Sequence, residues 1–114
     1  MIFVTGPLYA GKRSWIQTAL GWDGETLARR GVWDVQERAD EPDLPALADA
    51  LARYDVVIAT EVGGGVVPAD PAERRRRENA GRLACLLAER AETVVRVCCG
   101  LPQLLKGDWP CISG

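Results

Sequence analysis

MIFVTGPLYAGK, residues 1–12, joins an apolar run to a glycine-rich loop. Gly6 and Gly11 enclose four residues and Lys12 follows at once, which is the spacing of a phosphate-binding P-loop. Glycine lets the backbone turn tightly, so that N–H groups can face an anion. The apolar run predicts a buried strand over 2–5, and residues 12–21 predict a helix whose N-terminus adds positive charge. This context favours a phosphate site over a glycine-rich turn that binds nothing.

The predicted site comprises the loop and the first turn of the helix. Lys12 is its candidate catalytic residue, because the ammonium of a P-loop lysine reaches the outer phosphates. The candidate nucleotide-binding residues here are Gly6, Pro7, Leu8, Tyr9, Ala10, Gly11, Lys12, Arg13 and Ser14. Arg13 stands where P-loops carry the Ser or Thr that ligates Mg²⁺, and a guanidinium accepts no bond. Ser14 is turned by about 100° along the helix, so the involvement of Mg²⁺ stays open.

Composition excludes several classes of protein. The 114 residues, 47% apolar and 26% charged, are typical of one globular domain. The net charge of −2 argues against a general nucleic-acid binder. No apolar run approaches the ~20 residues of a membrane span, and no basic leader precedes the first strand, so we expect a cytoplasmic protein. The sequence has no histidine, which excludes every mechanism that uses a histidine of this chain.

Strands and helices are predicted to alternate along the chain. Asp43 caps a helix with the apolar stripe Leu44, Leu47, Ala48 and Leu51. Buried strands are predicted at 56–60 and 93–98, a helix from Asp70-Pro71 to Arg90, and a short strand over 32–36 with Trp33 and Val35 on one face. The pattern predicts an α/β P-loop (RecA-like) fold of reduced size with a mostly parallel sheet. We expect a single domain over 1–107 and a disordered tail over 108–114.

A second glycine-rich loop follows the strand at 56–60. Glu61 begins this loop, and Gly63 lies within it. Ligands of parallel sheets bind beyond the carboxyl ends of the strands. Glu61 is therefore a second candidate catalytic and nucleotide-binding residue, able to hold Mg²⁺ or orient a nucleophile, and Gly63 is a further binding residue. The alternative for Glu61 is a solvated loop residue. The arginines at 74–77 meet either an anion or only solvent.

Two segments resemble a known family. The first is IFVTGPLYAGK at the start of the chain. The second half contributes VVIATEVGGGVVP and ENAGRLACLLAERAETVVRVCCGLPQLLKG. They are similar to the bifunctional adenosylcobinamide kinase / adenosylcobinamide-phosphate guanylyltransferases of cobalamin biosynthesis. The resemblance covers residues 1–21 and 54–107. It implies ATP or GTP as the nucleotide and adenosylcobinamide as a substrate, with phosphoryl transfer followed by guanylyl transfer. It also implies that Gly6, Gly11 and Lys12 bind phosphates, with Glu61 and Gly63 beside them.

The chain departs from this family in ways that bear on the chemistry. The family's guanylyl transfer uses a histidine, and this chain has none. The segment after the first helix is shorter than in the family, and the strand that carries a central acidic residue is missing. Three interpretations follow. The chain is a reduced kinase or nucleotidyltransferase, a non-catalytic nucleotide- or partner-binding derivative, or an unrelated small P-loop kinase. A homo-oligomer is compatible with each of them.

Overall fold

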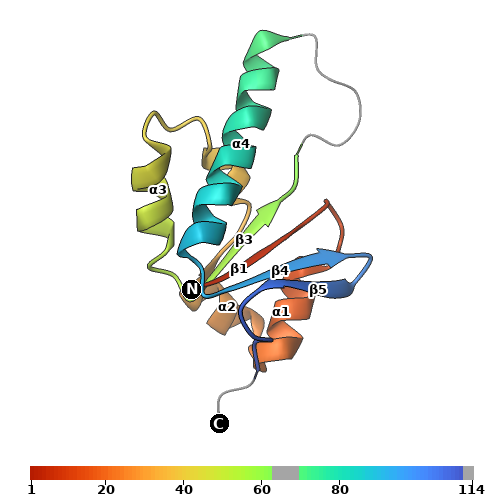
Figure 1. The fold of residues 1–114 in the computed structure, drawn as a ribbon. Helices are drawn as coiled ribbons and strands as arrows, with labels where there is room; N and C mark the ends of the chain where they lie inside the picture. Colours follow the sequence, from red (N-terminus) through yellow and green to blue (C-terminus); the bar gives the residue numbers. More distant parts are fainter. Residues whose placement is uncertain (63–69, 112–114) are drawn as a thin grey trace.

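The computed structural model describes residues 1–62 and 70–111 of the chain. Five strands alternate with four α-helices and one short 3-10 helix in this part (Figure 1). The elements are β1 (Ile2–Gly6), α1 (Lys12–Leu20), α2 (Gly24–Arg30), β2 (Gly31–Val32), η1 (Val35–Arg38), α3 (Leu44–Leu51), β3 (Val56–Thr60), α4 (Pro71–Arg90), β4 (Thr93–Cys98) and β5 (Leu101–Lys106).

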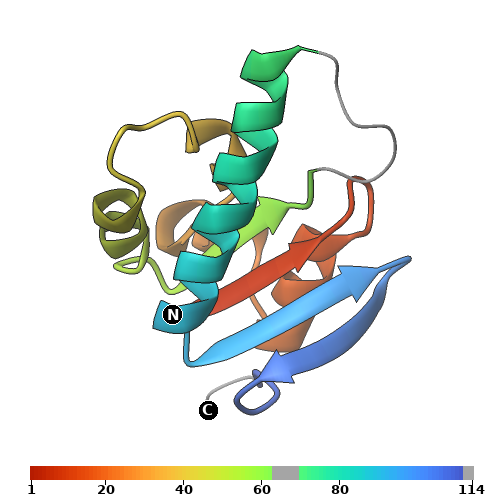
Figure 2. The ribbon, with the colours of Figure 1, turned by 45° about the horizontal axis from the view of Figure 1, so that its top comes forward.

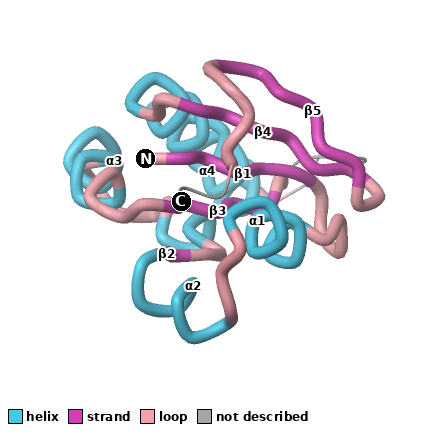
Figure 3. The backbone as a smooth tube through the Cα atoms, turned by 90° about the horizontal axis from the view of Figure 1, so that it is seen from below, coloured by secondary structure: helices cyan, strands magenta, loops and turns pink. Residues whose placement is uncertain are grey.

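The strands form one sheet in the order β2-β3-β1-β4-β5. β1 lies at the centre and pairs in parallel with β3 and β4, so that Ile2 is opposite Val56 on one side and Thr93 on the other. β2 extends the parallel part beyond β3, and β5 adds an antiparallel edge to β4. Figure 3 shows the strands side by side in this order. The predicted α/β class with a mostly parallel sheet is confirmed.

Helices cover both faces of the sheet and create two apolar clusters. Along β1, Phe3 packs with residues of α3 and α4, whereas Val4 packs with Ile16 of α1 and Leu27 of α2. This alternation follows from the two-residue period of a strand. Figure 2 shows α4 lying across one face while α1 lies behind the sheet. Both faces of the central strands are therefore buried, as their apolar sequences predict.

The two helices on the α4 face begin at caps that the sequence specifies. The Asp43 carboxylate accepts a bond from the Ala46 N–H at 3.0 Å, and Asp70 accepts one from the Ala72 N–H at 3.0 Å. Proline stands in the first turn of each helix, where its missing N–H is not needed. The predicted stripe of α3 is buried throughout. Helix starts and burial thus confirm the predictions for 43–51 and 70–90.

The strand predicted over 32–36 is wrong. β2 ends at Val32, and η1 begins at Val35. Asp34 between them has a φ of 56°, a left-handed conformation that no strand accommodates. The side chain of Gln36 then accepts a bond from the Thr60 N–H at 2.9 Å, which fastens η1 to the end of β3. The chain therefore turns where the alternation of apolar residues indicated a strand.

A strand that was not predicted from the sequence, β5, follows soon after Cys98. Cys99 and Gly100 have φ values of 54° and 74°, and they join β4 to β5 as a tight hairpin. β5 contains Pro102 and is the edge of the sheet, where proline is tolerated. The hairpin brings the β4 end of the sheet next to the glycine-rich loop.

Beyond β5 the chain is described as far as Cys111. The Trp109 ring packs edge-on against Trp15 of α1, with 6.4 Å between the ring centroids. Residues 112–114, the end of the tail for which disorder is expected, lie outside the described residues. Within 1–62 and 70–111, no helix combines the length and apolar character that a membrane crossing requires.

Candidate functional site

The glycine-rich loop leaves β1 at a position that only glycine can occupy. Gly6 has a φ of 152°, and a β-carbon there would lie 2.0 Å from the carbonyl oxygen of Val97 on β4. Further along, Tyr9 has a φ of 60° and Gly11 a φ of 83°. Left-handed residues in this alternation curl a backbone into an anion-binding concavity. The loop thus has the bend expected of a phosphate cradle.

Neighbouring strands hold the two ends of this loop. The Glu61 N–H donates to the Gly6 carbonyl oxygen at 2.8 Å, so the end of β3 fixes the loop's start. The Gly100 N–H donates to the Ala10 carbonyl oxygen at 2.9 Å, so the β4–β5 hairpin fixes its other end. These bonds use carbonyl oxygens of the loop as acceptors and leave its N–H groups uninvolved.

The N–H groups of the loop are unpaired within the described part of the chain. None of the backbone N–H groups of residues 8–14 donates to another described residue, and the first such bond comes from Trp15 to the Gly11 carbonyl oxygen. The first N–H groups of any helix lack an intrahelical partner and are satisfied by side chains, water or a ligand. The N-terminal end of α1 adds its partial positive charge at the same place. Seven donors are therefore available to an anion.

Lys12 completes this basic surface. Its side chain is 7% exposed, which makes it the buried charged residue among those that the structure describes. The ammonium donates to the Pro7 carbonyl oxygen at 2.7 Å and so lies beneath the loop. Burial lowers the pKa of Lys12 from its usual 10.5, and the carboxylates of Asp34 and Glu61 oppose this shift. A phosphate in the loop would supply the counter-charge that these carboxylates provide only from a distance.

A cleft of about 400 Å³ opens over the loop. Predicted site residues that line it are Leu8, Tyr9, Ala10, Gly11, Lys12, Arg13 and Ser14. Gly6 and Pro7 are not in the lining. Gly6 is packed against β4, and the Pro7 carbonyl oxygen accepts from the Lys12 ammonium. The volume is in the range of small-ligand sites. The structure therefore gathers most of the predicted loop residues around one opening.

Four residues that the sequence reasoning did not select also line this cleft: Trp33, Asp34, Ile58 and Thr60. Trp33 and Asp34 directly follow β2, and Ile58 and Thr60 belong to β3; both strands run parallel to β1. The sequence feature that could have indicated these residues is the position of Trp33-Asp34 directly after Gly31-Val32, the short segment that forms β2. The order of strands, which places β2 beside β3, was needed to bring that segment to the loop.

Arg13 is directed toward an aromatic ring. Its guanidinium carbon lies 5.3 Å from the centroid of the Trp33 ring, within the range of a cation–π interaction. Both residues line the cleft. Arg13, which stands where P-loops usually carry Ser or Thr, is thus held at the wall of the cleft by Trp33, the residue after β2.

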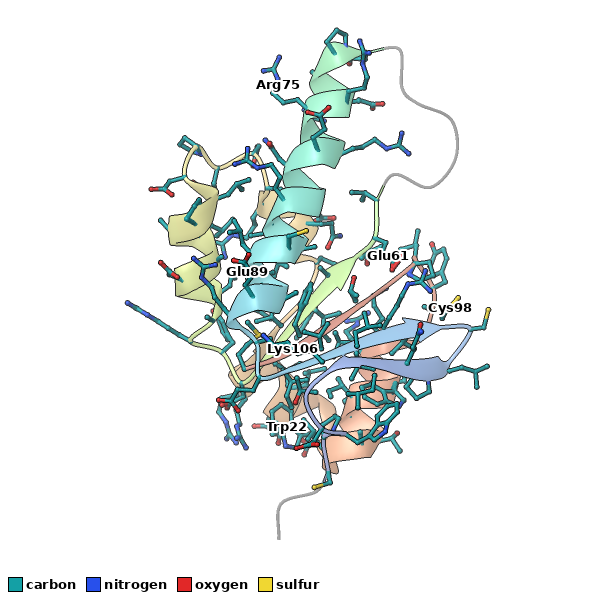
Figure 4. The ribbon with its side chains drawn as sticks, viewed as in Figure 1. Trp22, Glu61, Arg75, Glu89, Cys98 and Lys106 are labelled. Carbon is teal, nitrogen blue, oxygen red and sulfur yellow. The ribbon has the colours of Figure 1, made fainter. Side chains whose placement is uncertain are left out.

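Glu61 lies at the same edge of the sheet, in a different arrangement. Both of its carboxylate oxygens accept from Arg96 of β4, at 2.5 and 2.9 Å. It lines a smaller cleft of about 100 Å³ on the α4 face, together with Thr5, Gln36 and Ala84 among others. Figure 4 shows Glu61 beyond the end of β3. Gly63, the other predicted residue of this loop, lies outside the described residues.

The arginine run is remote from the loop. Arg74, Arg75 and Arg76 are exposed in the first turns of α4 and do not line the cleft. Figure 4 shows Arg75 near the outer end of that helix, well away from Glu61. Among residues 1–62 and 70–111, no group of three or more cysteine, aspartate and glutamate side chains is arranged to hold a metal ion.

A mostly parallel sheet with a glycine-rich loop between its central strand and the first helix defines a small α/β domain of the P-loop type. A sequence model described as "Cobinamide kinase / cobinamide phosphate guanyltransferase" (CobU) matches residues 21–105. The chain belongs to this family, which confirms the resemblance noted in the sequence. The matched range begins after the glycine-rich loop, so the interpretation of the loop rests on its own sequence and geometry.

A curated relative agrees with this assignment. The chain is 42% identical over 53 residues to the "Bifunctional adenosylcobalamin biosynthesis protein CobP" of Pseudomonas aeruginosa. The aligned segment covers 46% of this chain and 31% of that protein. The chain therefore spans less than a third of this relative's length, and the relative's functions are not transferred by the match alone.

Proposed function

We propose that the chain is a nucleotide-binding protein of cobalamin biosynthesis or salvage that transfers a phosphoryl group from ATP or GTP to adenosylcobinamide. The observation that carries the proposal is the set of unpaired N–H groups at residues 8–14, arranged around the cleft with Lys12 beneath them. Family membership supports the choice of pathway and substrate. The Pseudomonas aeruginosa relative is named as bifunctional, and only phosphoryl transfer is proposed for this chain.

The loop and Lys12 would act by holding the phosphates. Phosphoryl transfer requires little covalent chemistry from the protein, so positioning and charge stabilisation account for most of its catalysis. The N–H groups of the loop bind phosphate oxygens, and the Lys12 ammonium exchanges the Pro7 carbonyl for an outer phosphate oxygen. Lys12 is buried, so this interaction is formed largely away from water, where it is strong.

The residues that line the cleft include side chains of the kind that a hard divalent cation binds. Asp34, Thr60 and Ser14 are among the lining residues, and each has a side-chain oxygen. Mg²⁺ is bound in such sites by one or two carboxylates together with substrate phosphates and water. When bound with the nucleotide, the ion would neutralise charge on the outer phosphates.

Guanylyl transfer through a histidine is not proposed, because the chain contains no histidine. A non-catalytic, nucleotide-binding role is the second candidate. It is favoured by Arg13, which stands at the hydroxyl position and lies against Trp33. It is also favoured by Glu61, whose two oxygens are occupied by Arg96. In this case the loop binds ATP or GTP and no phosphoryl group leaves it.

A transfer assay separates the two candidates. The purified chain is incubated with γ-labelled ATP or GTP, Mg²⁺ and adenosylcobinamide, and label is followed into the cobinamide product. The proposal predicts labelled cobinamide product with wild type and none with Lys12→Ala. Lys106→Ala, a variant of the chain's other lysine, should retain transfer. Nucleotide binding by wild type without any transfer would instead establish the non-catalytic role.

A further inference from the structure

The residue after the P-loop lysine cannot hold the metal in this chain. Arg13 carries only donors, and its guanidinium lies over the Trp33 ring. A kinase that works through a nucleotide–Mg²⁺ complex would need another oxygen ligand close to Lys12.

Glu61 is the carboxylate that the sequence favours as a metal ligand, but its pairing with Arg96 argues against this role. Arg96 binds both of its oxygens in a two-pronged arrangement. Such Arg–carboxylate pairs are among the stronger hydrogen-bonded interactions. Glu61 also lines the small cleft on the α4 face and not the cleft over the loop. Recruiting it for a metal over the loop would require the pair with Arg96 to break.

Asp34 meets the requirements that Glu61 fails. It lines the same cleft as Lys12. Its carboxylate makes no hydrogen bond or salt bridge with any residue in the described ranges. It lies close enough to attract the Lys12 ammonium more strongly than Glu61 does. Its backbone is held in a left-handed conformation with a φ of 56°, and such conformations in non-glycine residues are concentrated at functional sites.

We propose that Asp34 is the carboxylate that holds the divalent cation of the bound nucleotide, in place of the hydroxyl lost at Arg13. Thr60, which lines the same cleft at the end of β3, carries the second protein oxygen that we assign to the ion. The remaining ligands are phosphate oxygens and water, as Mg²⁺ prefers. This inference rests on the proposed nucleotide site, because the phosphates complete the coordination.

If Asp34 holds the cation, the effect of Asp34→Asn on nucleotide affinity changes sign when Mg²⁺ is added. Without a divalent cation, the Asp34 carboxylate repels the phosphates, so Asp34→Asn should bind nucleotide as tightly as wild type or more tightly. With Mg²⁺, the carboxylate attracts the complex, so the same variant should bind less tightly than wild type. A purely structural role for Asp34 would weaken binding equally under both conditions.

The experiment titrates the β,γ-imido analogues of ATP and GTP into wild type, Asp34→Asn and Glu37→Gln, each in Mg²⁺ and in EDTA. Glu37→Gln removes the same charge from an exposed residue of η1 that does not line the cleft. We expect Mg²⁺ to tighten binding at least about fivefold in wild type and in Glu37→Gln, a usual size for coupling between two ligands. In Asp34→Asn this tightening should be lost. Mn²⁺ uptake in the presence of the analogue can be measured from the electron paramagnetic resonance signal of free Mn²⁺. This uptake should be weaker in Asp34→Asn than in wild type.

The outcomes separate this inference from the proposed function. Equal tightening by Mg²⁺ in wild type and Asp34→Asn would overturn the role of Asp34 and leave the nucleotide site intact. Binding by wild type without any tightening by Mg²⁺, or equal weakening of Asp34→Asn in Mg²⁺ and EDTA, would also overturn it. A wild type that binds neither analogue under either condition would overturn the nucleotide site, and the cation site with it.

Discussion

Arg96 holds Glu61 by two parallel hydrogen bonds, from its Nε at 2.5 Å and from a terminal nitrogen at 2.9 Å. The two residues come from β4 and from the end of β3, the strands on either side of β1. Their pair therefore spans the end of the central strand, where the glycine-rich loop begins. The Glu61 N–H also donates to the Gly6 carbonyl oxygen. One residue thus links the neighbouring strands and the base of the loop.

This relationship predicts that Arg96 and Glu61 act as a unit. Arg96→Ala and Glu61→Gln should each lower stability slightly, because the pair is partly solvent-exposed. The double variant should be less destabilised than the sum of the two single ones. Arg96→Lys should behave like Arg96→Ala, since an ammonium cannot make the two-pronged contact. Urea unfolding of wild type, Arg96→Ala, Glu61→Gln and the double variant measures the coupling. Strict additivity would show that the pair contributes nothing in solution.

Gly6 is the position where an added methyl group should do most harm. Gly6→Ala would place a β-carbon 2.0 Å from the Val97 carbonyl oxygen, at a φ of 152°. We expect a loss of about 3 kcal/mol or more, from the combined clash and backbone strain. Gly100→Ala is the matched control, because its φ is also positive and nothing lies within 4 Å of its β-carbon. That variant should lose only about 1–2 kcal/mol. Equal losses would contradict the close packing of Gly6 on β4.

Lys12 should reduce the stability of the unliganded fold. Because burial lowers its pKa in the folded chain, the unfolded chain binds the proton more readily. The resulting cost is fully present below the lowered pKa and disappears as the pH rises from that value past 10.5. Lys12→Met should therefore be more stable than wild type at neutral pH. The difference should vanish above the usual lysine pKa. Urea unfolding at the two pH values tests this, and a wild type that is the more stable at neutral pH would refute it.

Arg13 offers a gain-of-function variant. Arg13→Ser restores the hydroxyl that ligates Mg²⁺ in other P-loops and removes the contact with Trp33. We expect Mg²⁺ to tighten nucleotide binding more in this variant than in wild type. In the Arg13→Ser background, Asp34→Asn should lose less of that tightening, because a second ligand is present. Calorimetric titration in Mg²⁺ and EDTA gives both numbers. An unchanged Mg²⁺ effect would mean that residue 13 does not face the ion.

Much of the fold could be predicted because its signals are local. Asp43 and Asp70 cap helices whose apolar residues recur with the helical period, and the structure has both helices where the sequence places them. The buried strands at 56–60 and 93–98 follow from apolar runs of strand length. The P-loop spacing likewise identified residues 8–14, which line the cleft over the loop.

The failures come from features that local patterns do not encode. Trp33 and Val35 alternate like strand residues, but Asp34 between them takes a left-handed conformation. β5 was not predicted, and its Pro102 is tolerated because the strand lies at the edge of the sheet. The place of Asp34 in the cleft depends on β2 pairing with β3, a contact between residues far apart in the sequence. The pairing of Glu61 with Arg96 is likewise set by strand order.

The claim on which the account depends is that the glycine-rich loop binds nucleotide phosphates, and intrinsic tryptophan fluorescence tests it most directly. ATP and GTP are titrated into wild type, Lys12→Ala and Lys106→Ala, with Trp15 just beyond the loop as a reporter. We predict saturable binding that weakens about tenfold or more in Lys12→Ala, the usual contribution of a charge-assisted hydrogen bond. Lys106→Ala, which alters the chain's other lysine, should bind like wild type. Equal binding by Lys12→Ala and wild type, or no binding by wild type, would contradict the account.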